Sequence, residues 1–545
     1  MTYTSHVDTF ARDNLPPKRQ WPELIFELPQ LKYPARMNCA AELLDKAITA
    51  GHGERPVIHT EIDGRRYTCT YRQLLTRANQ IAHVLQKDMG LVPGSRVLLR
   101  GPNNPMMAAC WFAVIKAGCI AVTTMPLLRA RELKPIIDKA QIGAALCDIR
   151  LKEELEIARS QCPTLKQVLY FNDPRRGALE DLLEFHPEDF SNVDTAADDV
   201  CMIAFTSGTT GQPKAALHFH RDVMTVCECF PRSCLKPGKD DIFCGTPPLA
   251  FTFGLGGMLC FPVRYGASTA LIERLTPESM LKTVQDFKTT ILFTAPTYYR
   301  QMAALVREGA NRFDLSSLKK CVSAGEALPD TTRQAFKQAT GIEIIDGIGS
   351  TEMFHTFISH TPERVRRGAT GYAVPGYKAA VLDDDGRPVP SGTVGRLAVK
   401  GPIGCRYLAD ERQKTYVQGG WNITGDAYRM DADGYFFYQA RTDDMIVSAG
   451  YNIAGPEIES ALIEHEAVAE CGVVGVPDEA RGQIVKAFVV LKPGFGGGVD
   501  MVKKLQEFVK ASIAPYKYPR AIEFMQSLPR TETGKLQRFK LRQQG

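Results

Sequence analysis

The chain has 545 residues, of which 44% are hydrophobic and 23% are charged. This length exceeds what one hydrophobic core supports, and the composition is that of a globular protein, so we expect two or more folded domains. The formal net charge of +5 is small for such a length and gives no case for a nucleic-acid partner.

Cysteines and apolar stretches bear on compartment and membrane association. The 15 cysteines form neither a Cys-x-x-Cys pair nor a Cys/His metal spacing, and the first 20 residues lack the apolar centre of a secretory signal. We therefore expect reduced thiols and a cytoplasmic protein. Met106–Leu128 is the one long apolar stretch, but Lys116 and Gly118 interrupt it. Its pattern predicts a buried helix followed by a strand, so we expect no membrane partner.

Strand and helix signals alternate after a polar, proline-rich segment over residues 1–35. Alternation of this kind favours an α/β fold with a mostly parallel sheet that helices cover on both faces. The apolar spacing predicts a helix from Asn38, a strand over Tyr67–Tyr71, a helix over Arg72–Lys87, a strand over Arg96–Arg100, a helix that Gly118 caps, and strands over Ile120–Val122 and Gly143–Cys147.

A loop rich in glycine and hydroxyl residues follows a predicted buried strand over Asp198–Phe205. Its glycines let the backbone turn N–H groups inward, its hydroxyls are donors, and its last residue is a lysine, so the loop predicts a polyphosphate site. It is not the common nucleotide P-loop, because two residues separate the last glycine from the lysine. A flexible surface turn is the alternative. The loop residues are Thr206, Ser207, Gly208, Thr209, Thr210, Gly211 and Lys214.

Four further stretches carry candidate functional residues. Pro247–Gly257 places aromatic residues beside glycines, with a core strand as the alternative, and Cys321–Leu328 predicts a strand that ends in a glycine turn. In Asp346–Glu352 two glycines allow a ligand to approach the backbone, and Asn422–Asp426 predicts a strand that ends at an acid.

The C-terminal part changes to a compact α+β pattern from Met445 onward. Gly494–Gly498 is expected to be a loop, and Gly534 predicts a tight turn that presents Lys535, although a lysine so near the end is commonly a solvated charge. The predicted elements are helices over Pro456–Ile463 and Val499–Ala511 and strands over Val468–Val476 and Ile484–Leu491.

In this order, the motifs resemble those of the adenylate-forming family of acyl-CoA synthetases, luciferases and peptide-synthetase adenylation domains. The likeness runs from about residue 38 to about residue 540. It implies an α/β fold with a large N-terminal domain of doubly wound sheets plus a β-barrel-like subdomain. A small α+β C-terminal domain would rotate about a hinge, and the implied ranges are 1–440, 441–444 and 445–545.

The resemblance implies ATP, CoA and Mg2+ as cofactors. It makes Lys535 the catalytic lysine, places Thr351 on the α-phosphate and gives Glu352 the magnesium. The remaining implied positions are Asp426 and Arg441 on the ribose, Asp443 as hinge, Gly450 beside the pantetheine tunnel, and Ser323, Ala324, Gly325, Glu326, Asp346, Gly347 and Ile348 around the nucleotide.

The aryl branch of the family has the greatest likeness. Asp346–His355 resembles the benzoate-CoA ligase form of its motif, and His6–Pro17 resembles the start of 2-aminobenzoate-CoA ligases. Many relatives carry an aromatic residue at Ile348, so adenine stacking there should be weaker or come from another residue. Short, flat, apolar walls suit a benzene ring, and the implied acid pocket is Ala250, Phe251, Phe253, Gly325, Ile348 and His355, the last with a core histidine as the alternative.

We therefore expect an ATP-dependent ligase that joins a small aromatic carboxylate, benzoate or 2-aminobenzoate, to CoA and acts as a monomer or homodimer. Three alternatives stay open. The acid could be a medium-chain fatty acid, or a free-standing module could acylate a carrier protein. A non-catalytic nucleotide-binding protein is the third, but Glu352 and Lys535 are both present.

Overall fold

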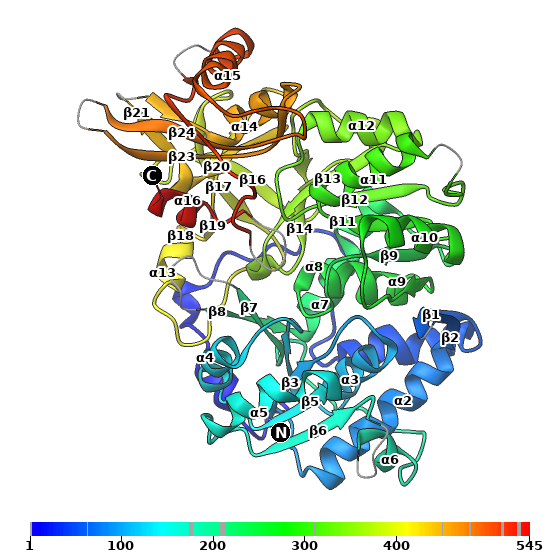
Figure 1. Cartoon of the computed structure of the whole chain (residues 1–545). Helices are drawn as coiled ribbons and strands as arrows, with labels where there is room; N and C mark the ends of the chain where they lie inside the picture. The colour runs from blue at the N-terminus through cyan, green and yellow to red at the C-terminus, as the bar shows by residue number, and fades with distance from the viewer. Residues whose placement is uncertain are drawn as a thin grey trace.

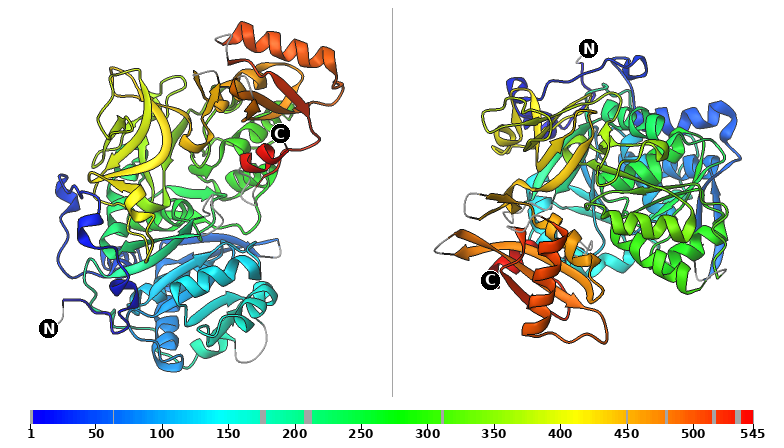
Figure 2. Two further views of the ribbon diagram at one scale, coloured as in Figure 1. Left: turned by 90° about the vertical axis from the view of Figure 1, so that its left-hand side faces the viewer. Right: turned by 90° about the horizontal axis from the view of Figure 1, so that it is seen from above.

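The computed structural model describes residues 3–62, 64–173, 178–206, 213–309, 312–448, 451–478, 481–513, 517–530 and 536–544. Within these ranges the strands form four sheets. The C-terminal elements, orange to red, gather at one end of the molecule, and the blue and cyan N-terminal elements lie at the other (Figures 1 and 2). The expected α/β class, with a large N-terminal and a small C-terminal domain, is confirmed, while the exact limits of the domains stay a prediction.

The first large sheet ends in the strand pair that flanks the glycine-rich loop. Its β3 is buried on both faces, because Val97 and Leu99 enter one hydrophobic core and Leu98 enters another. Such two-sided burial is typical of parallel strands between helix layers. The strand order is β6 (Gln167–Phe171), β5 (Ala144–Asp148), β3 (Arg96–Arg100), β4 (Ile120–Thr124), β7 (Val200–Thr206) and β8 (Lys214–Phe219), parallel except for the last pair.

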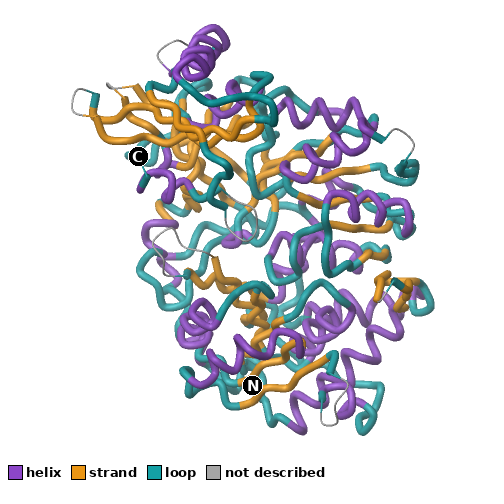
Figure 3. The backbone as a smooth tube through the Cα atoms, viewed as in Figure 1, coloured by secondary structure: helices purple, strands orange, loops and turns teal. Residues whose placement is uncertain are grey.

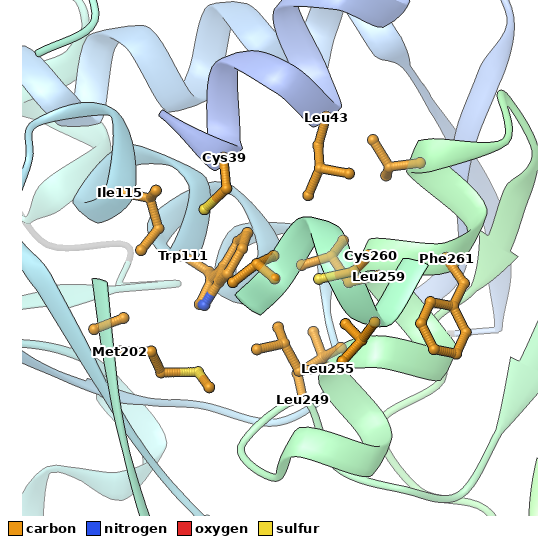
Figure 4. Close-up of a cluster of buried hydrophobic side chains, with 14 of the residues drawn as sticks. Cys39, Leu43, Trp111, Ile115, Met202, Leu249, Leu255, Leu259, Cys260 and Phe261 are labelled. Atoms are coloured by element: carbon orange, nitrogen blue, oxygen red, sulfur yellow. The ribbon is translucent and has the colours of Figure 1, made fainter. Parts of the chain in front are cut away.

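The second large sheet carries the other candidate nucleotide residues. Trp111 and Cys39 belong to the same buried hydrophobic cluster as Leu255 and Leu259 (Figure 4). One core therefore joins the regions of the two large sheets. The strand order is β15 (Tyr372–Ala373), β14 (Thr356–Ser359), β13 (Ile344–Gly349), β12 (Lys320–Ser323), β11 (Ile291–Thr294), β9 (Ile242–Gly245), β10 (Ser268–Ala270), β1 (Pro56–Ile62) and β2 (Arg65–Thr70).

Two smaller sheets follow along the chain. The first is antiparallel and corresponds to the expected β-barrel-like subdomain. It contains β16 (Lys378–Leu382), β17 (Val394–Lys400), β19 (Trp421–Met430), β18 (Val417–Gln418) and β20 (Phe436–Arg441). The C-terminal sheet has its own core and contains β22 (Tyr451–Ile453), β21 (Ile446–Ser448), β24 (Gly482–Leu491), β23 (Val468–Asp478) and β25 (Ala521–Phe524).

Helices cover the outside of the large sheets, as Figure 3 shows in purple. Among the described residues no helix combines the length and the apolar character needed to cross a bilayer. The α-helices are α1 (Phe10–Asp13), α2 (Tyr71–His83), α3 (Pro105–Lys116), α4 (Ala130–Ala140), α5 (Lys152–Ser160), α6 (Leu179–Leu183), α7 (His220–Glu228), α8 (Thr252–Leu255), α9 (Phe261–Arg264), α10 (Pro277–Phe287), α11 (Pro296–Glu308), α12 (Asp330–Thr340), α13 (Gln413–Tyr416), α14 (Gly455–Glu464), α15 (Val499–Ser512) and α16 (Arg538–Gln543). Short helical segments include η3 (Ala41–Asp45), η8 (Gly256–Cys260), η9 (Thr351–Met353) and η11 (Thr442–Asp444).

Two expectations from the sequence need correction. The core-strand alternative for Pro247–Gly257 is wrong, because the chain turns there and forms α8 and the start of η8. A Cβ at Gly254 would lie 2.0 Å from the carbonyl oxygen of Pro248, so the fold-back depends on that glycine. Asp426 does not end its strand, since β19 continues to Met430.

Candidate active site

The glycine-rich loop joins two antiparallel neighbours. Thr206, the last residue of β7, is paired in register with Lys214, the first residue of β8. The loop therefore starts and ends at one point on the edge of the first large sheet. Its remaining candidate residues, Ser207, Gly208, Thr209, Thr210 and Gly211, lie outside the described residues.

Three side chains hold the turn that carries Thr351 and Glu352. The Tyr407 hydroxyl donates a hydrogen bond to the Glu352 carboxylate, and His218 Nε2 donates to the carbonyl oxygen of Thr351 at 2.8 Å. The Tyr416 hydroxyl lies 3.2 Å from the Ser350 hydroxyl. The contacts come from β8, from α13 and from the segment before α13, so elements distant in sequence fix this turn.

Tyr407 also lies beside the lysine of the loop. Lys214 Nζ is 5.6 Å from the centre of the Tyr407 ring. Burial and the negative charge of Glu352 raise the pKa of Tyr407 far above its usual range, so the phenol is protonated and acts as the donor. One ring thus contacts both the cation of the loop and the acid of the second motif.

A buried ion pair supports this region from behind. Arg406 and Asp222 are both fully buried and bonded to each other, and Arg406 lies 4.1 Å from the centre of the Phe219 ring. Burial opposes ionisation of Asp222, but the Arg406 guanidinium and His218 hold the pKa of this carboxyl below its usual range. Breaking such a pair leaves an uncompensated buried charge.

The candidate nucleotide residues of the second sheet lie on and just after two neighbouring strands, β12 and β13. Ser323, the last residue of β12, is the register partner of Asp346 within β13. The turn with Ala324, Gly325 and Glu326 follows β12, while β13 continues through Gly347 and Ile348 to Gly349. Gly325 has φ +90°, which favours glycine, and Glu326 accepts a hydrogen bond from Thr297 Oγ1 at 3.2 Å. Burial raises the pKa of Asp346, and its Oδ1 has no hydrogen-bond partner among the described residues.

The two residues expected to bind the ribose contact each other just before the expected hinge. Asp426 and Arg441 are register partners on β19 and β20, with Arg441 Nη1 3.0 Å from Asp426 Oδ1. After them comes η11, which contains the hinge candidate Asp443. Gly450 and the catalytic candidate Lys535 lie outside the described residues.

The structure brings part of the candidate acid pocket together. His355 is buried and lies 5.2 Å from Phe253 between ring centres, with Phe230, Phe261 and Phe293 around it. Its Nε2 donates to the carbonyl oxygen of Phe253 at 3.3 Å, while Nδ1 has no partner in the described part of the chain. Burial lowers the pKa of His355 to about 3, so the imidazole is neutral. Ala250 is buried and Phe251 half-buried in the turn before α8, and Ile348 packs against the same core as Phe253.

The donor set at Glu352 fits a divalent cation. The carboxylate is 7% exposed, and within the described residues its bonding partner is a neutral phenol and no cation pairs with it. A buried carboxylate without a cationic partner is unfavourable unless a metal or another positive group approaches it. Thr351 supplies a hydroxyl beside it.

Sequence reasoning did not single out Tyr407, Tyr416 or His218. Each lies outside the glycine-containing motifs, and only the three-dimensional contacts bring it to the turn at Thr351. The sequence offers one signal for Tyr407. Successive side chains of an extended segment point to opposite sides, so an extended segment before α13 would separate Tyr407 from the charged Arg406.

A second group of potential ligands lies in the core. The ligand atoms of Cys39, Cys201 and His220 lie within 4.8 Å of one another, all buried. His220 Nδ1, however, accepts the backbone N–H of Cys39 at 3.1 Å, and burial lowers the pKa of His220 to about 3 and raises that of the Cys39 thiol. This arrangement is that of a packed core with reduced thiols.

Comparison with known proteins places the chain in a family. The AMP-binding enzyme family matches residues 45–407, and the AMP-binding enzyme C-terminal domain matches residues 457–535. Benzoate–CoA ligase of Thauera aromatica is 35% identical over 521 residues, or 94% of this chain and 97% of that protein. A mitochondrial acyl-coenzyme A synthetase of Rattus norvegicus is 31% identical over 532 residues, or 94% and 91%. The crystal structure of an anthranilate CoA ligase in complex with anthranoyl-AMP matches with a TM-score of 0.87 at 34% identity, over 95% of this chain and 99% of that one. The chain therefore belongs to the AMP-binding, adenylate-forming enzymes, and its sequence and fold are similar to those of benzoate– and anthranilate–CoA ligases.

Proposed function

We propose that the protein is an ATP- and Mg2+-dependent aryl-CoA ligase. It converts benzoate or 2-aminobenzoate through the acyl-adenylate to the CoA thioester and releases AMP and pyrophosphate. The observation that carries the proposal is the meeting of Lys214, Tyr407 and Glu352, which joins the phosphate-loop motif to the acid motif at one place. The similarity to ligases of benzoate and anthranilate supports the aryl substrate.

In the first half-reaction the substrate carboxylate attacks the α-phosphorus of ATP, and the bond from that phosphorus to the pyrophosphate oxygen breaks. The residues of the protein would position the carboxylate and the phosphate and neutralise the charge that shifts between them. The loop from Thr206 to Lys214 would hold the phosphates, and Lys535 would bridge the carboxylate and the α-phosphate. Glu352, with Thr351 beside it, would hold Mg2+, which when bound neutralises phosphate charge.

In the second half-reaction the CoA thiol displaces AMP from the acyl carbon and loses its proton. We propose that the small domain rotates at Asp443 between the two steps. Two hydrogen-bonded contacts support this position of the hinge. Thr442 donates to the carbonyl oxygen of Gly425 in the large domain at 3.1 Å, and Asp444 pairs with Arg542 of α16 at 2.8 Å. The residue before Asp443 is thus bonded to the large domain and the residue after it to the small domain.

We propose that His355 favours a substrate whose benzene ring carries an amino group. Its Nε2 hydrogen bonds to Phe253, so the neutral ring leaves Nδ1 as an acceptor without a partner among the described residues. A 2-amino group carries the N–H donor that this atom lacks, whereas benzoate does not. A site that leaves a buried acceptor unpaired discriminates against the ligand without the donor.

A medium-chain fatty acid is the second candidate substrate. The 31% identity to a relative named only as an acyl-coenzyme A synthetase supports keeping this alternative. A carrier protein in place of CoA would leave the first half-reaction unchanged.

Product analysis with matched variants tests the proposal. With ATP, Mg2+, CoA and 2-aminobenzoate we expect AMP, pyrophosphate and the aryl-CoA in equal amounts. His355→Phe should lower the preference for 2-aminobenzoate over benzoate by about twofold to tenfold, the value of one hydrogen bond. Pyrophosphate release without thioester formation would contradict CoA as acceptor, and an unchanged preference would contradict the role of His355.

A further inference from the structure

We propose that Tyr407 is a positioning residue for the first half-reaction, because its hydroxyl orients the Glu352 carboxylate while Tyr416 and His218 fix the same turn from other sides. This inference rests on the proposed role of Glu352 as the magnesium ligand. It assigns a role to a segment that none of the nucleotide motifs contains.

The turn itself is held in one conformation. Thr351 is held through its carbonyl oxygen and Ser350 through its hydroxyl, which also accepts the backbone N–H of Met353 at 3.3 Å. Phe354, the next residue, has φ +69° and ψ −53°, a positive-φ conformation that is costly for a bulky side chain. It persists because the Phe354 ring is buried against His218, with 5.0 Å between ring centres.

The backbone of Tyr407 is fixed to the strand that begins at the loop. Leu217 donates to the carbonyl oxygen of Arg406 at 2.8 Å, and Leu408 donates to that of Ala215 at 2.9 Å. The Tyr407 N–H donates to Gln413 Oε1 at 2.9 Å. The segment therefore forms an antiparallel β-bridge to β8 between Ala216 and Tyr407, and Lys214 at the start of β8 comes to lie against the Tyr407 ring.

A phenol suits this position for an electrostatic reason. Its hydrogen bond fixes the orientation of the carboxylate and leaves the negative charge for a metal, whereas a lysine or arginine would neutralise that charge. The neighbouring Arg406 is fully buried and pairs with Asp222, as expected where successive side chains of an extended segment point to opposite sides. This pairing directs the guanidinium to Asp222, so the phenol and not a cation contacts Glu352.

The test is Tyr407→Phe, which removes the hydroxyl and keeps the ring beside Lys214 and Tyr416. We expect the Mg2+ concentration for half-maximal acid-dependent pyrophosphate release to rise about 10- to 100-fold, the usual effect of removing such a support. Calorimetry should show the same rise in the Mg2+ concentration needed for ATP binding without the acid, a readout independent of turnover. Thioester formation from synthetic acyl-AMP should be unchanged.

Two further variants make the result specific. Tyr71→Phe is the matched control, because the buried Tyr71 hydroxyl donates to the carbonyl oxygen of Ala267 at 2.6 Å, far from this turn in the fold. It should leave the Mg2+ dependence as in the wild type. Tyr416→Phe removes the contact to Ser350 and should shift the Mg2+ dependence in the same direction, which tests the inference even if Tyr407→Phe fails to fold.

The outcomes separate this inference from the proposed function. A wild-type protein without Mg2+- and acid-dependent pyrophosphate release would overturn the proposed function. A wild type with that activity, together with an unchanged Mg2+ dependence in a folded Tyr407→Phe, or in Tyr416→Phe where the first variant does not fold, would overturn the positioning role alone. Equal losses in both half-reactions would likewise mark Tyr407 as structural.

Discussion

Gly425 has φ +77°, and a Cβ at this position would lie 2.7 Å from Arg441 Nη2. Gly425→Ala should therefore displace Arg441 from Asp426 and raise the KM for ATP about 10- to 150-fold, the value of one charge-assisted hydrogen bond. Gly419→Ala is the matched control, because Gly419 has φ +55° with no atom within 4 Å of its Cβ. It carries the backbone strain without the clash, so an equal rise in KM would contradict the role of Arg441.

Asp346 should make stability depend on pH. Burial raises its pKa in the folded protein above the ordinary value of 3.8. The unfolded chain then releases the proton first as pH rises, so the stability from this group is full below about pH 4 and falls on the way to the folded pKa, by up to about 1.4 kcal/mol per pH unit.

Thermal unfolding of Asp346→Asn across this range checks the sign. The amide cannot titrate, so the Tm of the variant should gain on that of the wild type as pH rises from about 4 to about 8. A difference in Tm that stays constant with pH would mean that the carboxyl keeps its ordinary pKa.

At the scale of elements, the hinge gives a prediction about order of steps. Asp443 lies in η11 between Thr442, bonded to the large domain, and Asp444, bonded to α16. Proline at this position fixes φ near −65° and so restricts the rotation of the backbone. Asp443→Pro should block thioester formation from acyl-AMP and spare pyrophosphate release, as measured by separate assays of the two half-reactions. A parallel fall of both rates would move the hinge elsewhere.

Elements with continuous apolar runs could be predicted closely from the sequence. The strand over Arg96–Arg100 has the expected bounds, and Gly118, with φ +69°, follows the end of α3 as a helix-capping glycine should. Both follow from local chemistry alone. The helix at Thr252 could not be predicted in this way, because its fold-back depends on the fit of Gly254 against Pro248.

In the candidate site, too, residues in local sequence patterns could be predicted, and residues that only tertiary contacts bring there could not. The strand ends near Thr206 and Ser323 and the glycines after Asp346 follow from local patterns, and the sheet brings Ser323 and Asp346 into register. Tyr407 could not be found from its neighbours in sequence, because its bond to Glu352 spans 55 residues and depends on the β-bridge between Tyr407 and β8. Contacts of this kind depend on tertiary structure that no short window contains.

At the scale of the whole molecule, the two half-reactions should require different arrangements of the domains. Arg300 of α11 reaches Glu470 of β23 at 3.3 Å, so a rotation of the small domain has to break this pair. Lys535, proposed to act in the first step alone, should become dispensable after the rotation. Lys535→Ala should slow adenylation about 100- to 1000-fold and leave thioester formation from synthetic acyl-AMP intact. Equal loss of both half-reactions would contradict the role of Lys535.

The central claim is that this protein activates a benzoate-type acid with ATP and transfers it to CoA. The most direct measurement is carboxylate-dependent AMP formation with ATP, Mg2+ and CoA across benzoate, 2-aminobenzoate, hydroxybenzoates, phenylacetate, hexanoate, octanoate and acetate. We predict the highest kcat/KM on 2-aminobenzoate or benzoate and little turnover of the aliphatic acids. Activity that rises with chain length toward octanoate would contradict the aryl substrate, and no AMP with any acid would contradict the ligase itself.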